Sequence, residues 1–292
     1  MILVIGATGT NGREVVDRLV ATGRKVRALV RAAAGAGGPG QRGVEVVPGD
    51  LGDPRSLAKA LEGVERAFYL GPVDPRAEEW FANVLDATRQ AGTKHLVKFS
   101  GMGAGVEASS EIMRMHGRTD EALVASGLPF TILRPNSFYQ NMLWSAATIR
   151  DRGAFYQPIG DARQSFVDVR DIADVAVAAL TGPGLEGETI EITGPEALSF
   201  HDVAAKLSAA LGRAITYVPV SLDDAYNGMI QAGMPEWNAR ELRELYGAFA
   251  AGGFDRTNDA VEQIAGHPPI AFDRIAREYA DAFGGAGATV AR

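Results

Sequence analysis

The 292-residue sequence contains no cysteine and only four histidines. Without cysteine the chain can form no disulfide, bind no metal through a thiolate and use no cysteine nucleophile. The histidines lie far apart and show no metal-ligand spacing, so we expect no metal site. They are His95, His116, His201 and His267.

The sequence also has fewer basic than acidic residues, with 29 Lys and Arg and 36 Asp and Glu, so its formal net charge is −7. This balance argues against direct binding to nucleic acid or to an anionic membrane. No apolar run approaches the length that spans a bilayer, and the first residues already have the character of a strand. We therefore expect a cytoplasmic protein without a targeting or membrane segment.

The hydrophobic pattern of the first half alternates between strands and helices. Strands are expected at 2–5, 25–31, 44–50, 66–71, 95–101 and 129–135, and helices at 13–23, 53–63, 76–91 and 109–126. Strict alternation implies right-handed crossovers and a parallel sheet with both faces covered. The sequence thus predicts an α/β fold, a Rossmann-type doubly wound sheet that binds its ligand at the carboxyl ends of the strands.

Beyond residue 150 the pattern loosens into short strands near 154–159, 188–193 and 215–220 and a helix-rich segment from 221 to 283. We expect a dinucleotide-binding domain over 1–150 and a smaller C-terminal α+β lobe over 151–284. This lobe would be interleaved with the sheet and hold the substrate. A mobile glycine-rich loop is expected at 32–43 and a disordered tail at 285–292.

The first predicted turn carries glycine at every third position, as Gly6, Gly9 and Gly12. In a strand–turn–helix context these glycines allow a sharp exit from the strand, a close approach to a pyrophosphate and tight packing of the helix on the sheet. The helix N-terminus then favours an anion. Short polar side chains are added by Thr8, Thr10 and Asn11. The alternative is a turn that only joins strand to helix.

The second predicted strand ends at Arg31. At this position an acidic residue accepts the ribose hydroxyl of NAD, whereas an arginine accommodates the 2′-phosphate of NADP. Arg31 therefore favours NADP, with NADPH preferred over NADH. The alternative is an ordinary solvated arginine at a strand end, and the adjoining glycine-rich loop could move its side chain.

Several segments in a fixed order resemble the NmrA-like group of atypical short-chain dehydrogenases. They are GATGTNG at 6–12, GDLGDPRSL at 49–57, FSGMGA at 99–104, HGRTDEAL at 116–123, ILRPNSFYQNM at 132–142, FVDVRDIADVAV at 166–177 and HDVAAKLSAALGR at 201–213. This group includes NADPH-dependent quinone, azo-dye and triphenylmethane reductases and NADP-sensing regulators. The resemblance implies a Rossmann domain with a small C-terminal lobe.

The resemblance also implies where the cofactor lies. It places Asp50 and Leu51 beside the adenine, Leu70, Gly71 and Pro72 beside the nicotinamide-side ribose, and Pro135, Asn136 and Phe138 near the nicotinamide. Ser100 and Gly101, which end the fifth predicted strand, complete the expected cofactor residues.

One departure from most short-chain dehydrogenases concerns the proton donor. None of the seven tyrosines is followed by a lysine four residues later, so the usual acid/base pair is absent. His116 and Asp120 lie one helical turn apart near the expected position, and a histidine that titrates near neutrality could supply a proton. Alternatively His116 is bonded only to Asp120 or solvent. Ser100 could bind a substrate carbonyl or only cap the next turn.

Without this acid/base pair the protein could still transfer a hydride from the cofactor to an acceptor whose reduction needs little general acid catalysis. The sequence predicts an NADPH-dependent reductase of conjugated, electron-poor acceptors such as quinones and azo or related dyes. The acceptor pocket should be apolar and aromatic, with residues after the sixth strand facing residues of the helix-rich segment: Phe138, Tyr139, Met142 and Trp144 on one side and Met229, Met234, Trp237, Tyr246 and Phe249 on the other. Alternatively, most of these side chains only pack the smaller lobe. Alternatives are a non-catalytic NADP(H) sensor and, more weakly, an isomerase or epimerase. A homodimer is one expected assembly.

Overall fold

The computed structural model describes residues 1–31, 40 and 43–284, and its centre is a seven-stranded sheet. All neighbouring strands are parallel, in the order β3-β2-β1-β4-β5-β6-β8. The strands are β1 (Ile2–Ile5), β2 (Val26–Val30), β3 (Glu45–Pro48), β4 (Arg66–Tyr69), β5 (His95–Phe99), β6 (Phe130–Pro135) and β8 (Glu188–Ile192). This arrangement confirms the predicted Rossmann-type doubly wound sheet.

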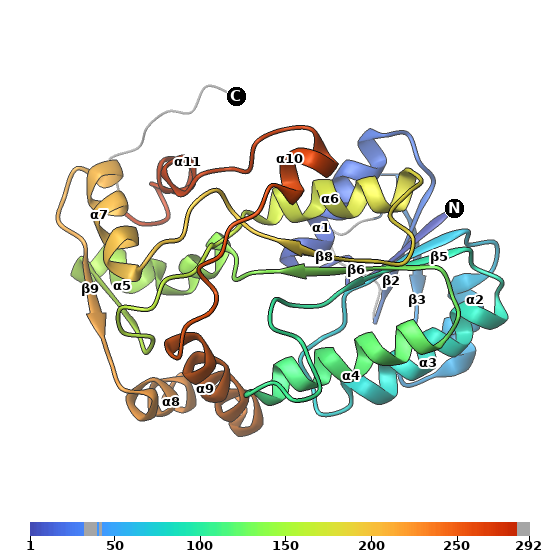
Figure 1. Ribbon diagram of the computed structural model, residues 1–292, viewed down its shortest axis with the longest axis horizontal. Helices are drawn as coiled ribbons and strands as arrows, with labels where there is room; N and C mark the ends of the chain where they lie inside the picture. The colour runs from blue at the N-terminus through green and yellow to red at the C-terminus, as the bar shows by residue number, and fades with distance from the viewer. Residues whose placement is uncertain (32–39, 41–42, 285–292) are drawn as a thin grey trace.

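Helices cover both faces of the sheet, as Figure 1 shows. On one face lie α1 (Thr10–Ala21), α6 (Val169–Thr181) and α10 (Ala260–Ala265); on the other lie α2 (Pro54–Leu61), α3 (Ala77–Gln90) and α4 (Glu111–Ala125). Because both faces are covered, all four residues of β1 are buried. This burial explains the uninterrupted apolar run at the start of the chain.

Local signals set most helix ends close to where the sequence indicates them, although α1 begins at Thr10, three residues before its expected start. The Asp53 side chain accepts a hydrogen bond from the Arg55 backbone N–H at 3.1 Å, and Pro54 occupies the first turn of α2. Gly23 and Gly63, which follow α1 and α2, have φ values of 73° and 70°. These left-handed conformations let the chain leave each helix at little cost for glycine.

The second half of the chain builds a smaller body beside the sheet. It contains η2 (Tyr139–Ser145), α5 (Ala146–Arg152), β7 (Ala154–Gln157), α7 (Phe200–Leu211), β9 (Thr216–Pro219), α8 (Leu222–Gln231), α9 (Glu236–Ala250) and α11 (Phe272–Glu278). Strands β7 and β9 pair in parallel, and aromatic side chains including Tyr139, Phe155 and Phe272 form a separate core. The expected strand near 188–193 is present as β8, yet it extends the main sheet beside β6.

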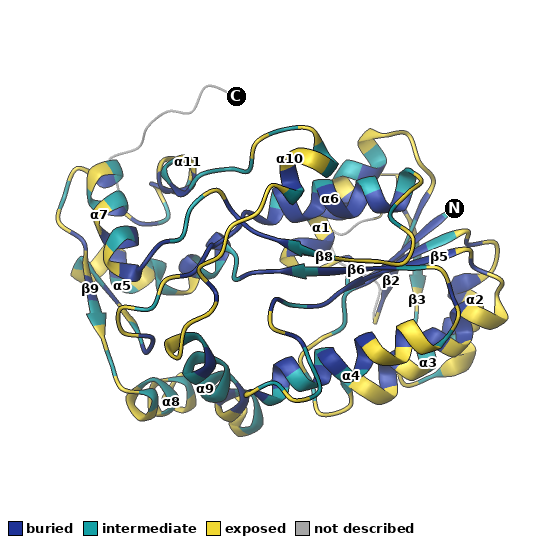
Figure 2. Ribbon diagram, viewed as in Figure 1, coloured by how far each residue is buried: buried dark blue, intermediate teal, exposed yellow. Residues whose placement is uncertain are grey.

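The two bodies meet beside the carboxyl ends of the main strands, where α9 packs against α4 (Figure 1). Figure 2 shows that buried residues follow the strands and the inner sides of α1, α4 and α6, whereas α8 has none. Among the described residues, no helix is long and apolar enough to cross a membrane. The tail expected at 285–292 and most of the loop expected at 32–43 fall outside the described residues.

Candidate functional site

Two hollows lie at the carboxyl edge of the sheet and share Leu70 and Gly71. The first, here the cofactor groove, has a volume of about 1050 Å³. It is lined by Ile5, Gly6, Thr8, Gly9, Leu29, Val30, Arg31, Gly49, Asp50, Leu51, Leu70, Gly71, Pro72, Arg76 and Trp80. The second, here the acceptor cleft, measures about 1770 Å³ and extends from β5 and β6 to α9. A ligand can therefore continue from one hollow into the other.

The first loop leaves no room for a side chain at two of its three glycines. A Cβ on Gly6, whose φ is 86°, would lie 2.5 Å from the Leu70 carbonyl oxygen, and a Cβ on Gly12 would lie 2.0 Å from that of Gly6. A Cβ on Gly9 would meet nothing closer than 3.6 Å within the protein, so the space beside Gly9 is open. Gly12 thus serves helix packing, whereas Gly9 borders the cofactor groove.

The start of α1 is suited to hold a diphosphate. Its N-cap is Gly9, and no side chain caps the first turn, so the N–H groups there lack a side-chain partner. The Oδ1 atom of Asn11 is buried without a hydrogen-bond partner, and Asn11 borders the acceptor cleft. Free backbone donors, an uncapped helix N-terminus and an open glycine position are the features that a dinucleotide pyrophosphate requires.

At the other end of the cofactor groove, two arginines gather where the adenosine would lie. Arg31 lines the groove as expected, and so does Arg76, which precedes α3. The Arg76 guanidinium lies 4.4 Å from the centroid of the Trp80 ring, and Trp80 also lines the groove. The chemistry of this donor set fits a 2′-phosphate beside a flat base. Arg76 and Trp80 were missed from sequence because only the tertiary fold places the start of α3 and the end of β2 at the same groove.

The acceptor cleft is predominantly apolar. Aromatic residues on its walls are Phe99, Phe138, Trp144, Phe166, Phe200, Tyr246 and Phe249. Trp144 is 73% exposed and lines the cleft, as do the expected Phe138, Met142, Tyr246 and Phe249. Tyr139 packs instead in the separate core of the smaller body, and the cleft lining includes none of Met229, Met234 and Trp237. Such a surface suits a planar, conjugated ligand.

The predicted cofactor residues gather around these two hollows. Thr10, Asn11, Ser100, Gly101, Pro135, Asn136 and Phe138 line the acceptor cleft, and all the others except Gly12 line the cofactor groove. The Asn136 amide donates to Ser165 Oγ and to the Phe254 carbonyl, both at 2.8 Å, and its oxygen accepts from the Ser137 N–H. The side chain of Asn136 therefore borders the cleft, but its amide donor and its oxygen already form hydrogen bonds within the protein.

A buried ionic network lies behind Ser100. The Asp120 carboxylate accepts from Lys98 Nζ at 2.7 Å, from Ser100 Oγ at 2.9 Å and from the Arg134 guanidinium at 2.8 and 3.0 Å. Lys98 and Asp120 side chains are only 1% and 4% exposed. Since the Ser100 hydroxyl donates to Asp120, it can offer a ligand only its lone pairs. The lysine in an otherwise apolar strand was the overlooked signal.

His116 borders both the acceptor cleft and a smaller pocket on its far side. Burial, reinforced by the positive charges of Lys98 and Arg134, lowers the pKa of His116 to about 3. The expectation that this histidine titrates near neutrality is therefore wrong, because it stays a neutral imidazole. The described hydrogen bonds include none between His116 and Asp120, whose oxygens serve the network above.

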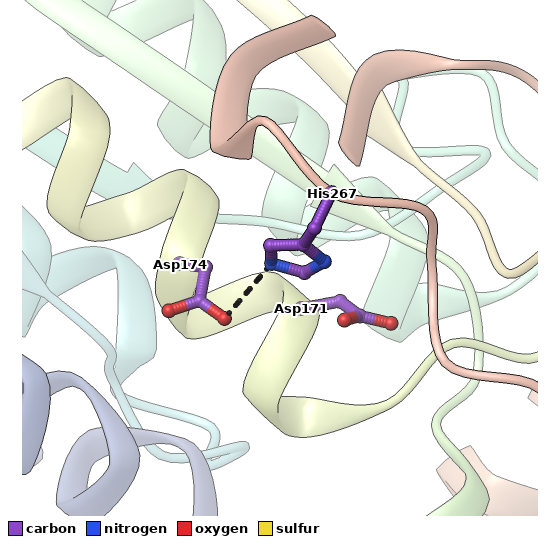
Figure 3. A group of neighbouring side chains, drawn as sticks. All are labelled: Asp171, Asp174 and His267. Atoms are coloured by element: carbon purple, nitrogen blue, oxygen red, sulfur yellow. Dashed lines mark hydrogen bonds and ion pairs between the residues drawn. The ribbon is translucent and has the colours of Figure 1, made fainter. Parts of the chain in front are cut away.

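A further polar cluster lies on α6, outside both hollows, and Figure 3 shows it. Potential ligand atoms of Asp171, Asp174 and His267 lie within 4.8 Å of one another. His267 contacts Asp174 at 3.3 Å, and Asp171 accepts the Ile270 N–H at 2.8 Å. Burial raises the pKa of Asp171 to about 6. These bonds attach the segment after α10 to α6. That the protein binds no metal stays a prediction from the sequence.

Comparison with known proteins agrees with this geometry. An NAD(P)H azoreductase of Xenophilus azovorans is 42% identical over 98% of this chain and 100% of its own. The structure of an Escherichia coli NADPH-dependent quinone oxidoreductase complexed with NADPH matches with a TM-score of 0.87 and 27% identity, covering 95% of this chain and 99% of that one. A Citrobacter triphenylmethane reductase complexed with NADP(H) matches with a TM-score of 0.85 and 27% identity, covering 96% and 100%. The model of the NmrA-like family matches residues 1–269, and the chain belongs to that family.

Proposed function

We propose that the protein is an NADPH-dependent reductase that transfers a hydride to conjugated, electron-poor acceptors, namely quinones and azo or related dyes. The observation that carries this proposal is the continuity of the cofactor groove with a large aromatic cleft through Leu70 and Gly71. Relatives named as an azoreductase, a quinone oxidoreductase and a triphenylmethane reductase support the same acceptor class.

The cofactor is NADPH, which when bound supplies the hydride. The loop from Gly6 to Gly9 and the uncapped start of α1 would hold its diphosphate. Arg31 and Arg76 would hold the 2′-phosphate, since a guanidinium pairs with phosphate through two parallel hydrogen bonds. Solved structures of family members with NADPH or NADP(H) bound support this choice.

The protein's own contribution is to hold the acceptor flat and to exclude water. Phe138 and Phe249 offer apolar faces, and the buried ions behind Ser100 leave a positive charge near the acceptor end. Lys98 and Arg134 share only one carboxylate, that of Asp120, so they stabilise negative charge that develops on an acceptor receiving a hydride. A simple ketone would instead require prompt protonation of an alkoxide.

The test is consumption of NADPH, followed by its absorbance, with a menadione-type quinone, an azo dye, a triphenylmethane dye, a simple ketone and, in the reverse direction, a secondary alcohol. We expect turnover of the first three and none of the last two. Tight NADPH binding without turnover of any acceptor would support an NADP(H) sensor. Cofactor retained through purification without net consumption would support an isomerase or epimerase.

Further features remain proposals from the sequence. We propose that residues 1–150 hold the cofactor and that 151–284 supply the substrate lobe, because α9 contributes Leu242, Tyr246 and Phe249 to the acceptor cleft. The partner is a small aromatic or conjugated molecule. We also propose a cytoplasmic location, a homodimer as one assembly and no direct binding to nucleic acid, each on the basis of the sequence.

A further inference from the structure

We propose that the small pocket behind the acceptor cleft delivers the proton for the reduced acceptor, and that the His116 side chain relays it from this pocket into the cleft. The inference rests on the proposed function and assigns a proton route that replaces the missing tyrosine and lysine.

The wall between the two hollows has one group able to carry a proton. The small pocket and the acceptor cleft share Gly71, Val73, Phe99, Ile112 and His116. Four of these five present only backbone or hydrocarbon. The imidazole has two ring nitrogens, so it can accept a proton at one and release a proton from the other.

The small pocket contains the groups that supply a proton. Lys98 lines it, and the space of about 30 Å³ that the centre of a water molecule can occupy leaves room for about one or two water molecules. The Lys98 ammonium has three N–H donors, and Asp120 takes one of them at 2.7 Å. Burial lowers the pKa of Lys98, which eases release of a proton. At the rim, Val73 is 42% exposed, which connects the pocket to solvent.

Two hydroxyl groups beside this route, that of Ser100 on the cleft side and that of Thr119 on the small-pocket side, already donate within the protein. Ser100 gives its hydroxyl proton to Asp120 at 2.9 Å, and the Thr119 hydroxyl donates to the Met115 and His116 carbonyls at 2.8 and 3.0 Å. Charged groups that face His116 come from three elements: Lys98 on β5, Asp120 on α4 and Arg134 on β6. Burial, aided by the net positive charge of these groups, lowers the pKa of His116 and keeps the imidazole neutral.

The step balances as follows. A quinone gains two electrons and one hydrogen as the hydride and needs one proton on oxygen. His116 breaks one N–H bond to supply this proton, and its other ring nitrogen forms an N–H bond with a proton from the small pocket. Lys98 or water loses that proton, and solvent restores it through the rim. The imidazole begins and ends neutral, in opposite tautomers.

A matched pair of acceptors tests the relay. A quinone needs the proton, whereas a triphenylmethane cation becomes a neutral leuco dye when it receives the hydride alone. We expect His116→Gln to lower kcat with the quinone by about 100-fold, within the range for general acid catalysis, and to change kcat with the dye by less than about twofold. Equal losses with both acceptors, or no loss with the quinone, would overturn the relay.

A second variant closes the route without altering the histidine. Ala77 lines the small pocket, so Ala77→Leu should lower the rate of quinone reduction and leave the rate of dye reduction unchanged. Ala82→Leu, on the exposed side of α3, serves as the control. If the wild-type protein reduces neither acceptor, the proposed function itself fails.

A readout independent of turnover is the nitrogen NMR spectrum of histidine-labelled protein without cofactor, with His116→Gln assigning the signal. We expect a neutral ring from about pH 5 to pH 8, because the side chain lies against two cations. An imidazolium that titrates near its ordinary value of about 6.5 would overturn the proposal.

Discussion

The two glycines Gly9 and Gly12 should separate cofactor binding from folding when each is changed to alanine. Gly12 lies inside α1, and a Cβ there would sit 2.0 Å from the Gly6 oxygen and 2.7 Å from the Gly6 carbonyl carbon. Both are backbone atoms, so the helix must move away from the strand. Overpacking of this kind costs about 3 kcal/mol, and the better helix propensity of alanine returns about 1 kcal/mol.

We therefore expect Gly12→Ala to lower the free energy of unfolding by about 2 kcal/mol. Gly9 has a φ of −77° and a ψ of 170°, which alanine adopts readily, and its Cβ would have ordinary contacts. The loss of a good N-cap and the lower entropy of the unfolded chain nearly cancel, so Gly9→Ala should change stability by less than about 0.5 kcal/mol.

For NADPH affinity the order should be reversed, with Gly9→Ala causing the larger loss. The methyl group of Gly9→Ala would occupy the space through which the backbone approaches the diphosphate, so we expect NADPH affinity to fall by about 10- to 100-fold, or about 1.4 to 2.8 kcal/mol. Urea unfolding without cofactor measures the stability, and a fluorescence titration measures the affinity. Wild-type affinity in a stable Gly9→Ala protein would refute the assignment of this loop to the diphosphate.

Four other substitutions have defined outcomes. Arg31→Ala should weaken the binding of NADPH far more than the binding of NADH, and Arg76→Ala should act in the same direction. Titrations with both cofactors measure this preference, and an unchanged preference for NADPH in either variant would show that the substituted arginine does not contact the 2′-phosphate. Asp120→Asn leaves the buried Lys98 ammonium without its counter-charge, so urea unfolding should show a loss of about 3 to 5 kcal/mol, and a loss below about 1 kcal/mol would contradict the network. A hydrogen bond to the Pro268 carbonyl, aided by Asp174, raises the pKa of His267 in the folded protein. The protonated His267 side chain therefore stabilises the fold fully below about pH 6.5, the pKa of a histidine in the unfolded chain. This stabilisation declines as the pH rises through the raised pKa of the folded state. The difference in urea midpoint between wild type and His267→Gln should shrink between about pH 5.5 and pH 8.5, and a constant difference would exclude this linkage.

The sequence by itself determined the alternating architecture and the glycine-rich first turn. These features depend on neighbours a few positions apart: glycine at every third residue of the first turn, Asp53 before Pro54 at a helix start, and apolar spacing along α1. Such local preferences act before any distant segment arrives, so they can be recognised without knowing the fold.

Only the tertiary structure decided the partners of Lys98, the neutral state of His116 and the place of β8 at the edge of the main sheet. The pKa of His116 depends on charges from β5, α4 and β6, which are distant in sequence and meet through sheet order. Arg76 joined the cofactor groove for the same reason. Burial and electrostatic potential are sums over surrounding segments, and chain spacing alone does not contain those distances.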